Sequence, residues 1–106
     1  MNSIETINET LNNNPAVMLY FSAPSCNVCH ALKPKLTHAI EENFEAFEIL
    51  SIDISQQPEV ASHFGVFTIP TILIFLDGKE FLRKSRNMSV EEVVGAIRRP
   101  YEIMMG

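Results

Sequence analysis

The chain has 106 residues, of which 46% are hydrophobic and 20% charged, and its formal net charge is −5. This length accommodates one domain, residues 1–106, with a hydrophobic core and leaves no room for a second. The negative charge argues against nucleic acid or an anionic membrane as a partner. No apolar run approaches the ~20 residues of a membrane span, and no leader-like segment opens the sequence. We therefore expect a cytoplasmic protein, and we expect it to be a monomer.

The first half of the chain predicts a helix, a strand and a second helix. The run Asn12-Asn13-Asn14-Pro15 ends the first helix. Residues 16–21 are apolar at every position, which is typical of a strand buried on both faces of a sheet. The second helix begins at Ser25 or Cys26, and Pro34 is expected to kink it.

The middle of the chain predicts two more strands around a short helix. Residues 47–53 read as a second strand, and Pro58 opens a short helix that stops at Gly65. Residues 71–76 form a third strand. Asp77-Gly78 then predicts a tight turn into an antiparallel fourth strand over residues 80–84.

The chain ends in a helix that Ser89 caps, with Glu92 completing a capping box. We expect Pro100 to interrupt this helix and to leave a short apolar tail at residues 101–106. The whole order is α-β-α-β-α-β-β-α. It predicts an α/β fold with a mixed sheet, parallel at first and antiparallel at one edge, and helices on both faces.

Cys26 and Cys29 are the only cysteines, and they stand two residues apart where the second helix begins. In a cytoplasmic chain this spacing is typical of a catalytic or metal-binding pair rather than a structural disulfide. Two thiolates do not complete a four-ligand zinc site, so we predict no metal. A helix N-terminus offers free N–H groups and a positive dipole end, which should lower the pKa of Cys26.

These features predict a thiol–disulfide cycle. Cys26 attacks a substrate disulfide and forms a mixed disulfide, and the more buried Cys29 resolves it. Ile69-Pro70 precedes the third strand, and a cis bond there would expose the Ile69 backbone for pairing with an extended substrate. Because only roughly 5% of X–Pro bonds are cis, this pattern alone leaves a trans bond open.

Taken together, these segments resemble the thioredoxin family. The matching segments are Tyr20–Cys29, Pro34, Ile52-Asp53, Phe64-Gly65-Val66, Ile69-Pro70-Thr71 and Phe75–Gly78. The resemblance implies a thioredoxin fold, with a central mixed sheet of about four strands flanked by four helices and without the family's first edge strand. It implies Cys26 as nucleophile, Cys29 as resolving thiol and a cis Pro70 facing the disulfide. It also implies disulfide-containing protein substrates, a thioredoxin reductase-type electron donor and no bound cofactor.

Some positions depart from the family pattern. Asn27-Val28 stands between the cysteines where a typical thioredoxin has Gly-Pro, and we expect this change to make the couple more oxidising. The family's buried Asp is matched by Tyr20, six residues before Cys26, and its companion Lys by Ile49. Tyr20 is then either a core residue or a group whose hydroxyl lies near Cys29 and replaces the missing acid. A phenol with a pKa of about 10 is a poor base at pH 7.

Further residues and alternatives stay open at this point. Phe67 and Val28 are candidates for an apolar rim around Cys26 that docks substrate, although Phe67 also fits a core position. His30 is either a solvated residue or a group that stabilises the thiolate when protonated. The missing Asp–Lys pair keeps open a binding or redox-sensing module with poor turnover. Cys26-Asn-Val-Cys-His30 also fits the attachment pattern of c-type haem, a remote alternative.

Overall fold

The computed structural model describes residues 2–106, and its elements follow the predicted order. The helices are α1 (Ile4–Asn13), α2 (Asn27–Asn43), α3 (Pro58–His63) and α4 (Val90–Met105). The strands are β1 (Ala16–Ser22), β2 (Phe47–Asp53), β3 (Thr71–Leu76) and β4 (Lys79–Ser85). The predicted strand boundaries are therefore confirmed to within one residue. Across residues 2–106, no helix has the length and apolar character needed to span a bilayer.

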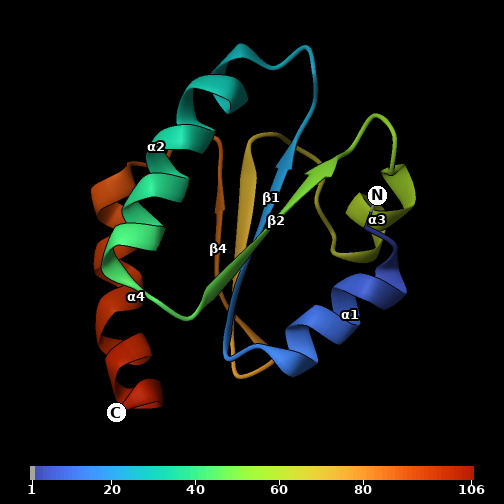
Figure 1. Ribbon diagram of the computed structural model, residues 1–106. Coiled ribbons are helices and arrows are strands. Elements are labelled where there is room, and N and C mark those ends of the chain that lie inside the picture. The colour runs from blue at the N-terminus through green and yellow to red at the C-terminus, as the bar shows by residue number, and fades with distance from the viewer. Residues whose placement is uncertain (1) are drawn as a thin grey trace.

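The four strands form one mixed sheet in the order β2-β1-β3-β4. β1 pairs in parallel with β2 and antiparallel with β3, and β3 pairs antiparallel with β4. Helices α2 and α4 cover one face, and α1 and α3 cover the other (Figure 1). This arrangement confirms the predicted mixed sheet with an antiparallel edge and helices on both faces.

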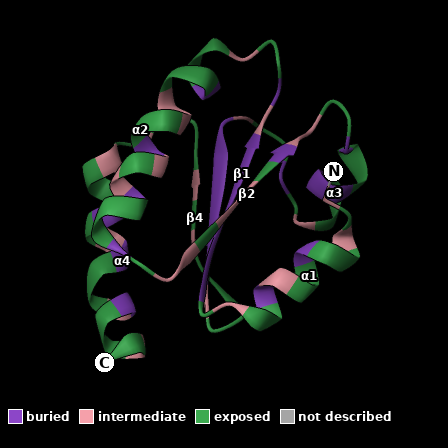
Figure 2. Ribbon diagram, in the orientation of Figure 1, coloured by how far each residue is buried: buried purple, intermediate pink, exposed green. Residues whose placement is uncertain are grey.

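Strand β1 is the buried centre of the sheet (Figure 2). Its side chains alternate between two cores because successive residues of a strand point to opposite faces. Met18 and Tyr20 pack on the side of α2 and α4. Leu19 and Phe21 pack on the side of α1 and α3. Tyr20 is thus directed toward α2, the helix that follows the first cysteine.

The strand register brings three loops together at one end of the sheet. Phe21, near the end of β1, pairs with Thr71, the first residue of β3. Thr71 also pairs with Ser85, the last residue of β4. The loop after β1, the loop before β3 and the loop after β4 therefore meet at this end. In Figure 1 it is the upper end, where β1 passes into α2.

Helix α4 contradicts the prediction that Pro100 interrupts it. The helix continues through Pro100 to Met105, so the predicted apolar tail is its last turn. Pro100 has no N–H to donate within the helix. Contacts with the rest of the molecule hold the turn instead. The hydroxyl of the buried Tyr101 accepts the Ala46 N–H at 2.9 Å, and its ring packs at a tilt against the Phe44 ring, with the ring centroids 4.8 Å apart.

The capping box predicted at Ser89 forms only in part. The Ser89 hydroxyl accepts the Glu92 N–H at 3.0 Å, as an N-cap residue should. The Glu92 carboxylate does not return to the cap but accepts from the Lys84 ammonium at 3.1 Å. An ion pair between β4 and α4 thus replaces the second half of the box.

Candidate active site

Cys26 and Cys29 are joined in a disulfide at the N-terminus of α2, with their Cα atoms 5.3 Å apart. Cys26 is the N-cap residue, and its sulfur accepts the Cys29 N–H at 3.1 Å. Cys26 is half-buried, whereas Cys29 is 1% exposed. A second molecule therefore reaches Cys26 first. The free N–H groups of the first helical turn favour negative charge on its sulfur.

Cys26 lies in a shallow depression of about 360 Å³ that the three converging loops form. The residues that line it are Cys26, Asn27, Val28, Ile69, Pro70, Arg86 and Asn87. The Ile69–Pro70 peptide bond is cis, as the resemblance implies. The structure thus brings four of the residues singled out in the sequence, Asn27, Val28, Ile69 and Pro70, next to Cys26.

Sequence reasoning missed two residues of this depression, Arg86 and Asn87. Both are exposed and belong to the loop between β4 and α4. The Arg86 N–H donates to the Pro70 carbonyl at 2.7 Å. The signal was available, since a hairpin at Asp77-Gly78 necessarily places the residue after β4 beside the residue before β3.

The predicted apolar rim is only half formed. Val28 is 61% exposed and lines the depression. Phe67 is 81% exposed, so it is not a core residue, yet it is not among the residues that line the depression. The apolar side chains that line the depression with Cys26 and Pro70 are therefore Val28 and Ile69.

His30 lies on the first turn of α2 and is exposed. Its Nε2 atom is 2.9 Å from the Pro24 carbonyl oxygen. Haem attachment at Cys26-Asn-Val-Cys-His30 would use both cysteine sulfurs, which here are bonded to each other. The geometry therefore favours a redox pair over haem attachment.

Tyr20 is fully buried, and its hydroxyl lies near Cys29, where it donates to the Cys29 carbonyl at 2.8 Å. Burial raises the pKa of Tyr20 to about 12. The phenol thus stays protonated at neutral pH and acts as a donor to the backbone. The buried polar side chains of residues 2–106 are Gln57 and Thr71, so no carboxylate, amine or imidazole is buried there. The interior of this part of the chain offers Cys29 no ionised base.

Alkaline pH is expected to destabilise the fold through Tyr20. The unfolded chain loses the phenol proton near pH 10, whereas the folded chain keeps it until about pH 12. The contribution is fully present below pH 10 and is lost at about 1 kcal/mol per pH unit above it. Urea unfolding at several pH values between these limits measures the loss. Tyr20→Phe should show a smaller pH dependence, and identical slopes for the two proteins would contradict this assignment.

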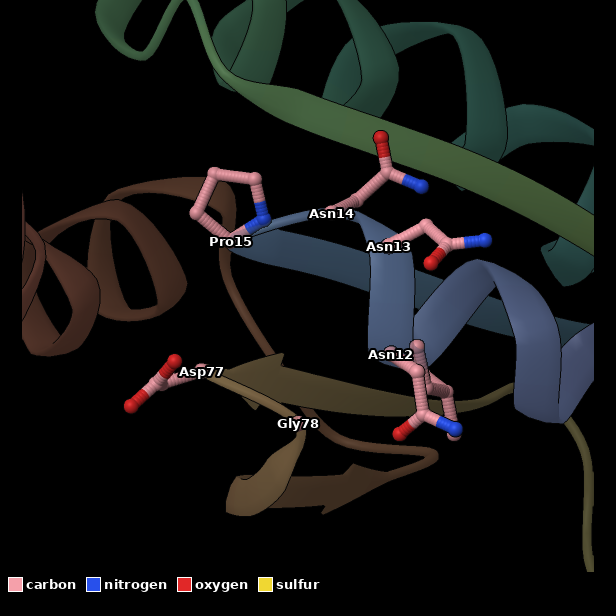
Figure 3. A pocket seen from close by; sticks show the side chains of 7 residues that line it. Asn12, Asn13, Asn14, Pro15, Asp77 and Gly78 are labelled. Atoms are coloured by element: carbon pink, nitrogen blue, oxygen red, sulfur yellow. The ribbon is translucent and has the colours of Figure 1, made fainter.

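A second hollow, of about 250 Å³, lies at the other end of the sheet (Figure 3). It is lined by Leu11, Asn12, Asn13, Asn14, Pro15, Asp77 and Gly78. Pro15 precedes β1 and Asp77 follows β3, so the sheet separates this hollow from Cys26. The Asp77 N–H donates to the Pro15 carbonyl at 2.8 Å, which ties the hairpin to the start of β1. The redox chemistry therefore belongs to the disulfide end of the sheet.

Comparison with known proteins gives a consistent match. The sequence model of the family described as Thioredoxin matches residues 2–99. "Thioredoxin-like protein YdfQ" of Bacillus subtilis (strain 168) is 33% identical over 106 residues, which cover 100% of this chain and 94% of that protein. A thioredoxin of Pyropia yezoensis is 30% identical over 89 residues, covering 84% and 75% of the two chains.

Solved structures agree with this match. Thioredoxin 1 from Thermosipho africanus TCF52B superimposes with a TM-score of 0.72 at 30% identity, covering 85% of this chain and 99% of that one. A mutant thioredoxin from Halobacterium salinarum NRC-1 has a TM-score of 0.81 at 21% identity over 95% and 87% of the chains, which shows a shared fold.

The family match and the fold give the two cysteines a chemical context. Cys-x-x-Cys at the start of a helix, with one sulfur accessible and the other buried, is an arrangement that exchanges disulfides. On the match over residues 2–99 and the four-stranded sheet that carries the Cys26–Cys29 disulfide, the chain belongs to the thioredoxin family and is a thiol–disulfide oxidoreductase.

Proposed function

We propose that this protein reduces protein disulfides by cycling Cys26 and Cys29 between dithiol and disulfide. The observation that carries the proposal is the disulfide at the start of α2, with Cys26 facing a depression beside Pro70. The accessible sulfur and the apolar Val28 and Ile69 side chains lie on the same surface. An extended segment that contains a disulfide can therefore reach the sulfur and contact the protein at once.

The proposed cycle uses two electrons and two protons. The Cys26 thiolate attacks one substrate sulfur and forms a mixed disulfide, and the other substrate sulfur leaves as a thiolate that takes up a proton. Cys29 then loses its proton and attacks the Cys26 sulfur. This step closes the Cys26–Cys29 disulfide and releases the second substrate thiol. The substrate is reduced by two electrons, and the protein dithiol is oxidised by two.

The remaining roles complete the proposal. Ile69, which lines the depression just before β3, pairs through its backbone with an extended substrate segment, because main-chain hydrogen bonds hold such segments without requiring a particular sequence. A thioredoxin reductase-type enzyme in the cytoplasm returns the protein to its dithiol form. This partner and the protein substrates are inferred from the family to which the chain belongs.

The test is a reduction potential together with a turnover assay. The Cys26–Cys29 couple is equilibrated in dithiol buffers, and free thiols are counted by mass spectrometry. A potential somewhat more oxidising than ~−270 mV but still below ~−230 mV, with steady reduction of insulin when a thioredoxin reductase and NADPH are supplied, is the expected result. A potential near ~−200 mV or above, without steady turnover, would count against a general reductase.

One observation favours a second candidate function. Tyr20 donates to a backbone carbonyl, and no carboxylate, amine or imidazole is buried in residues 2–106. Cys29 must lose its proton before it attacks the mixed disulfide. Without a buried base to accept that proton, this attack and the release of the reduced substrate are slow. The second candidate is therefore a redox-sensing or binding module that forms a disulfide with a partner and turns over slowly. The sensing or binding module would react rapidly with one equivalent of disulfide and then fail to turn over, whereas the reductase would continue through many cycles.

A further inference from the structure

Arg86 occupies a conformation that is unusual for its residue type. Its φ is +62°, in the left-handed region that a residue with a Cβ atom adopts only at a steric cost. Glycine would adopt this backbone freely. The N–H of Arg86 donates to the Pro70 carbonyl at 2.7 Å, so the backbone is fixed against the loop that precedes β3. An arginine side chain is thereby projected from a defined point beside Cys26.

The Arg86 guanidinium has no partner within residues 2–106. Two other arginines of the chain are engaged: Arg83 pairs with Glu80 at 2.9 Å, and Arg98 donates to the Asn43 side chain at 2.9 Å. Arg86, by contrast, makes no side-chain hydrogen bond or ion pair with these residues, although it lines the depression around the disulfide. Its hydrogen-bond donors are therefore available to a bound molecule.

The depression is locally positive in a chain of net charge −5. Of the described residues that line it, Arg86 alone carries a formal charge. Asn27 and Asn87 add amide groups that donate hydrogen bonds, and Val28 and Ile69 supply apolar contact. A guanidinium binds a carboxylate through two parallel hydrogen bonds, which gives direction as well as attraction. The surface around Cys26 is thus suited to a disulfide with a negative charge close by.

We propose that Arg86 makes the site selective for disulfides flanked by a carboxylate. The inference rests on the proposed reductase function and names its substrate class. While Cys26 engages a substrate sulfur, the carboxylate next to that sulfur pairs with the Arg86 guanidinium. The carboxylate comes either from an acidic residue of a protein segment or from a small acidic disulfide such as glutathione disulfide. The electron transfer itself is unchanged, so Arg86 is a specificity-determining residue.

The experiment compares three short peptides, each closed by an internal disulfide. The peptides differ only at one position beside a cysteine, which is Glu, Gln or Lys. Prereduced protein is mixed with each peptide at low salt, the reaction is quenched with acid, and the rate constant is obtained by mass spectrometry. We expect the Glu peptide to react about fivefold faster than the Gln peptide and the Lys peptide to react more slowly. The preference should shrink at about 0.5 M salt.

Variants of Arg86 test the assignment. Arg86→Asn removes the charge with a residue that tolerates positive φ, and the three rate constants should converge. Arg86→Lys keeps the charge and should keep the order of the peptides. Arg99→Gln removes the same charge from exposed α4 and should leave the preference unchanged. Any general effect of Arg86 on the reactivity of Cys26 cancels, because the readout is a ratio between peptides.

The outcomes separate this inference from the proposed function. Reaction of all three peptides at one rate, or a preference that survives in Arg86→Asn, overturns the inference and leaves the reductase function intact. If the wild-type protein reduces none of the three peptides, both the inference about Arg86 and the proposed reductase function are overturned. Glutathione disulfide identifies the source of the carboxylate. If it reacts as fast as the Glu peptide and slows equally in Arg86→Asn, small acidic disulfides are substrates; if it reacts slowly in both proteins, the carboxylate belongs to a protein segment.

Discussion

Replacing Cys29 with serine should convert the protein from a catalyst into a trap for its substrates. Cys26 keeps its place at the start of α2 and still attacks, but no neighbouring thiol resolves the mixed disulfide. An internal thiol acts at a very high effective concentration, so its loss should lower turnover at least about a thousandfold. The mixed disulfide should then accumulate, and mass spectrometry under non-reducing conditions would show a one-to-one adduct with a disulfide peptide.

The matched control is Cys26→Ser. It leaves Cys29, which is 1% exposed, as the only thiol, so no adduct should form with the folded protein. An adduct on Cys29 in this variant, with none on Cys26 in Cys29→Ser, would reverse the two roles. The pair of variants therefore tests the assignment of nucleophile and resolving thiol directly.

Replacing Tyr20 with aspartate should accelerate the second half of the cycle and destabilise the fold. Tyr20 lies beside the Cys29 backbone, so a carboxylate at this position can accept the Cys29 proton. A positioned general base contributes roughly a hundredfold or more, and we expect the mixed disulfide to decay at least about tenfold faster near pH 7. Removing a buried aromatic ring and burying a carboxyl group should lower the free energy of unfolding by about 4 kcal/mol.

Two controls isolate the carboxylate in that experiment. Tyr20→Asn creates a similar cavity without the charge, so it should be destabilised without faster decay of the mixed disulfide. Tyr20→Phe removes only the hydroxyl, costs about 1 kcal/mol of stability and should leave the decay rate unchanged. The rates are measured at low temperature by acid quench and mass spectrometry, with circular dichroism to confirm that each variant is folded. Slower decay in Tyr20→Phe would show that the hydroxyl takes part in proton transfer.

Much of the fold followed from local patterns in the sequence. The apolar run at residues 16–21 predicted a central strand because burial on both faces requires apolar side chains on both. Asp77 and Gly78 predicted the hairpin, and both have positive φ, at 53° and 78°. The position of the cysteine pair was also predicted from local patterns, because Cys26 stands between an apolar strand and an amphipathic helix, where a helix N-cap is expected.

The features that escaped prediction depend on contacts between distant segments. Pro100 was expected to end a helix, but the packing of Tyr101 on Phe44 holds the last turns in place. Phe67 was grouped with Val28 by its apolar character, yet the loop before β3 does not bring it to the depression. Arg86 was missed because its place beside the disulfide follows from the predicted pairing of β3 with β4 and not from the residues around it.

Because β3 and β4 form a hairpin, two different loops of the chain supply the thiols and the charged residue of the depression. The thiols come from the connection between β1 and α2, whereas the charge beside them comes from the connection between β4 and α4. The two connections meet only in space, so a change in one leaves the backbone of the other in place. On the proposal that Arg86 selects the substrate, a change in the loop after β4 would alter the choice of substrate and leave the thiol chemistry as it is. The same separation offers a route to redirect the protein toward new targets by exchanging a single loop.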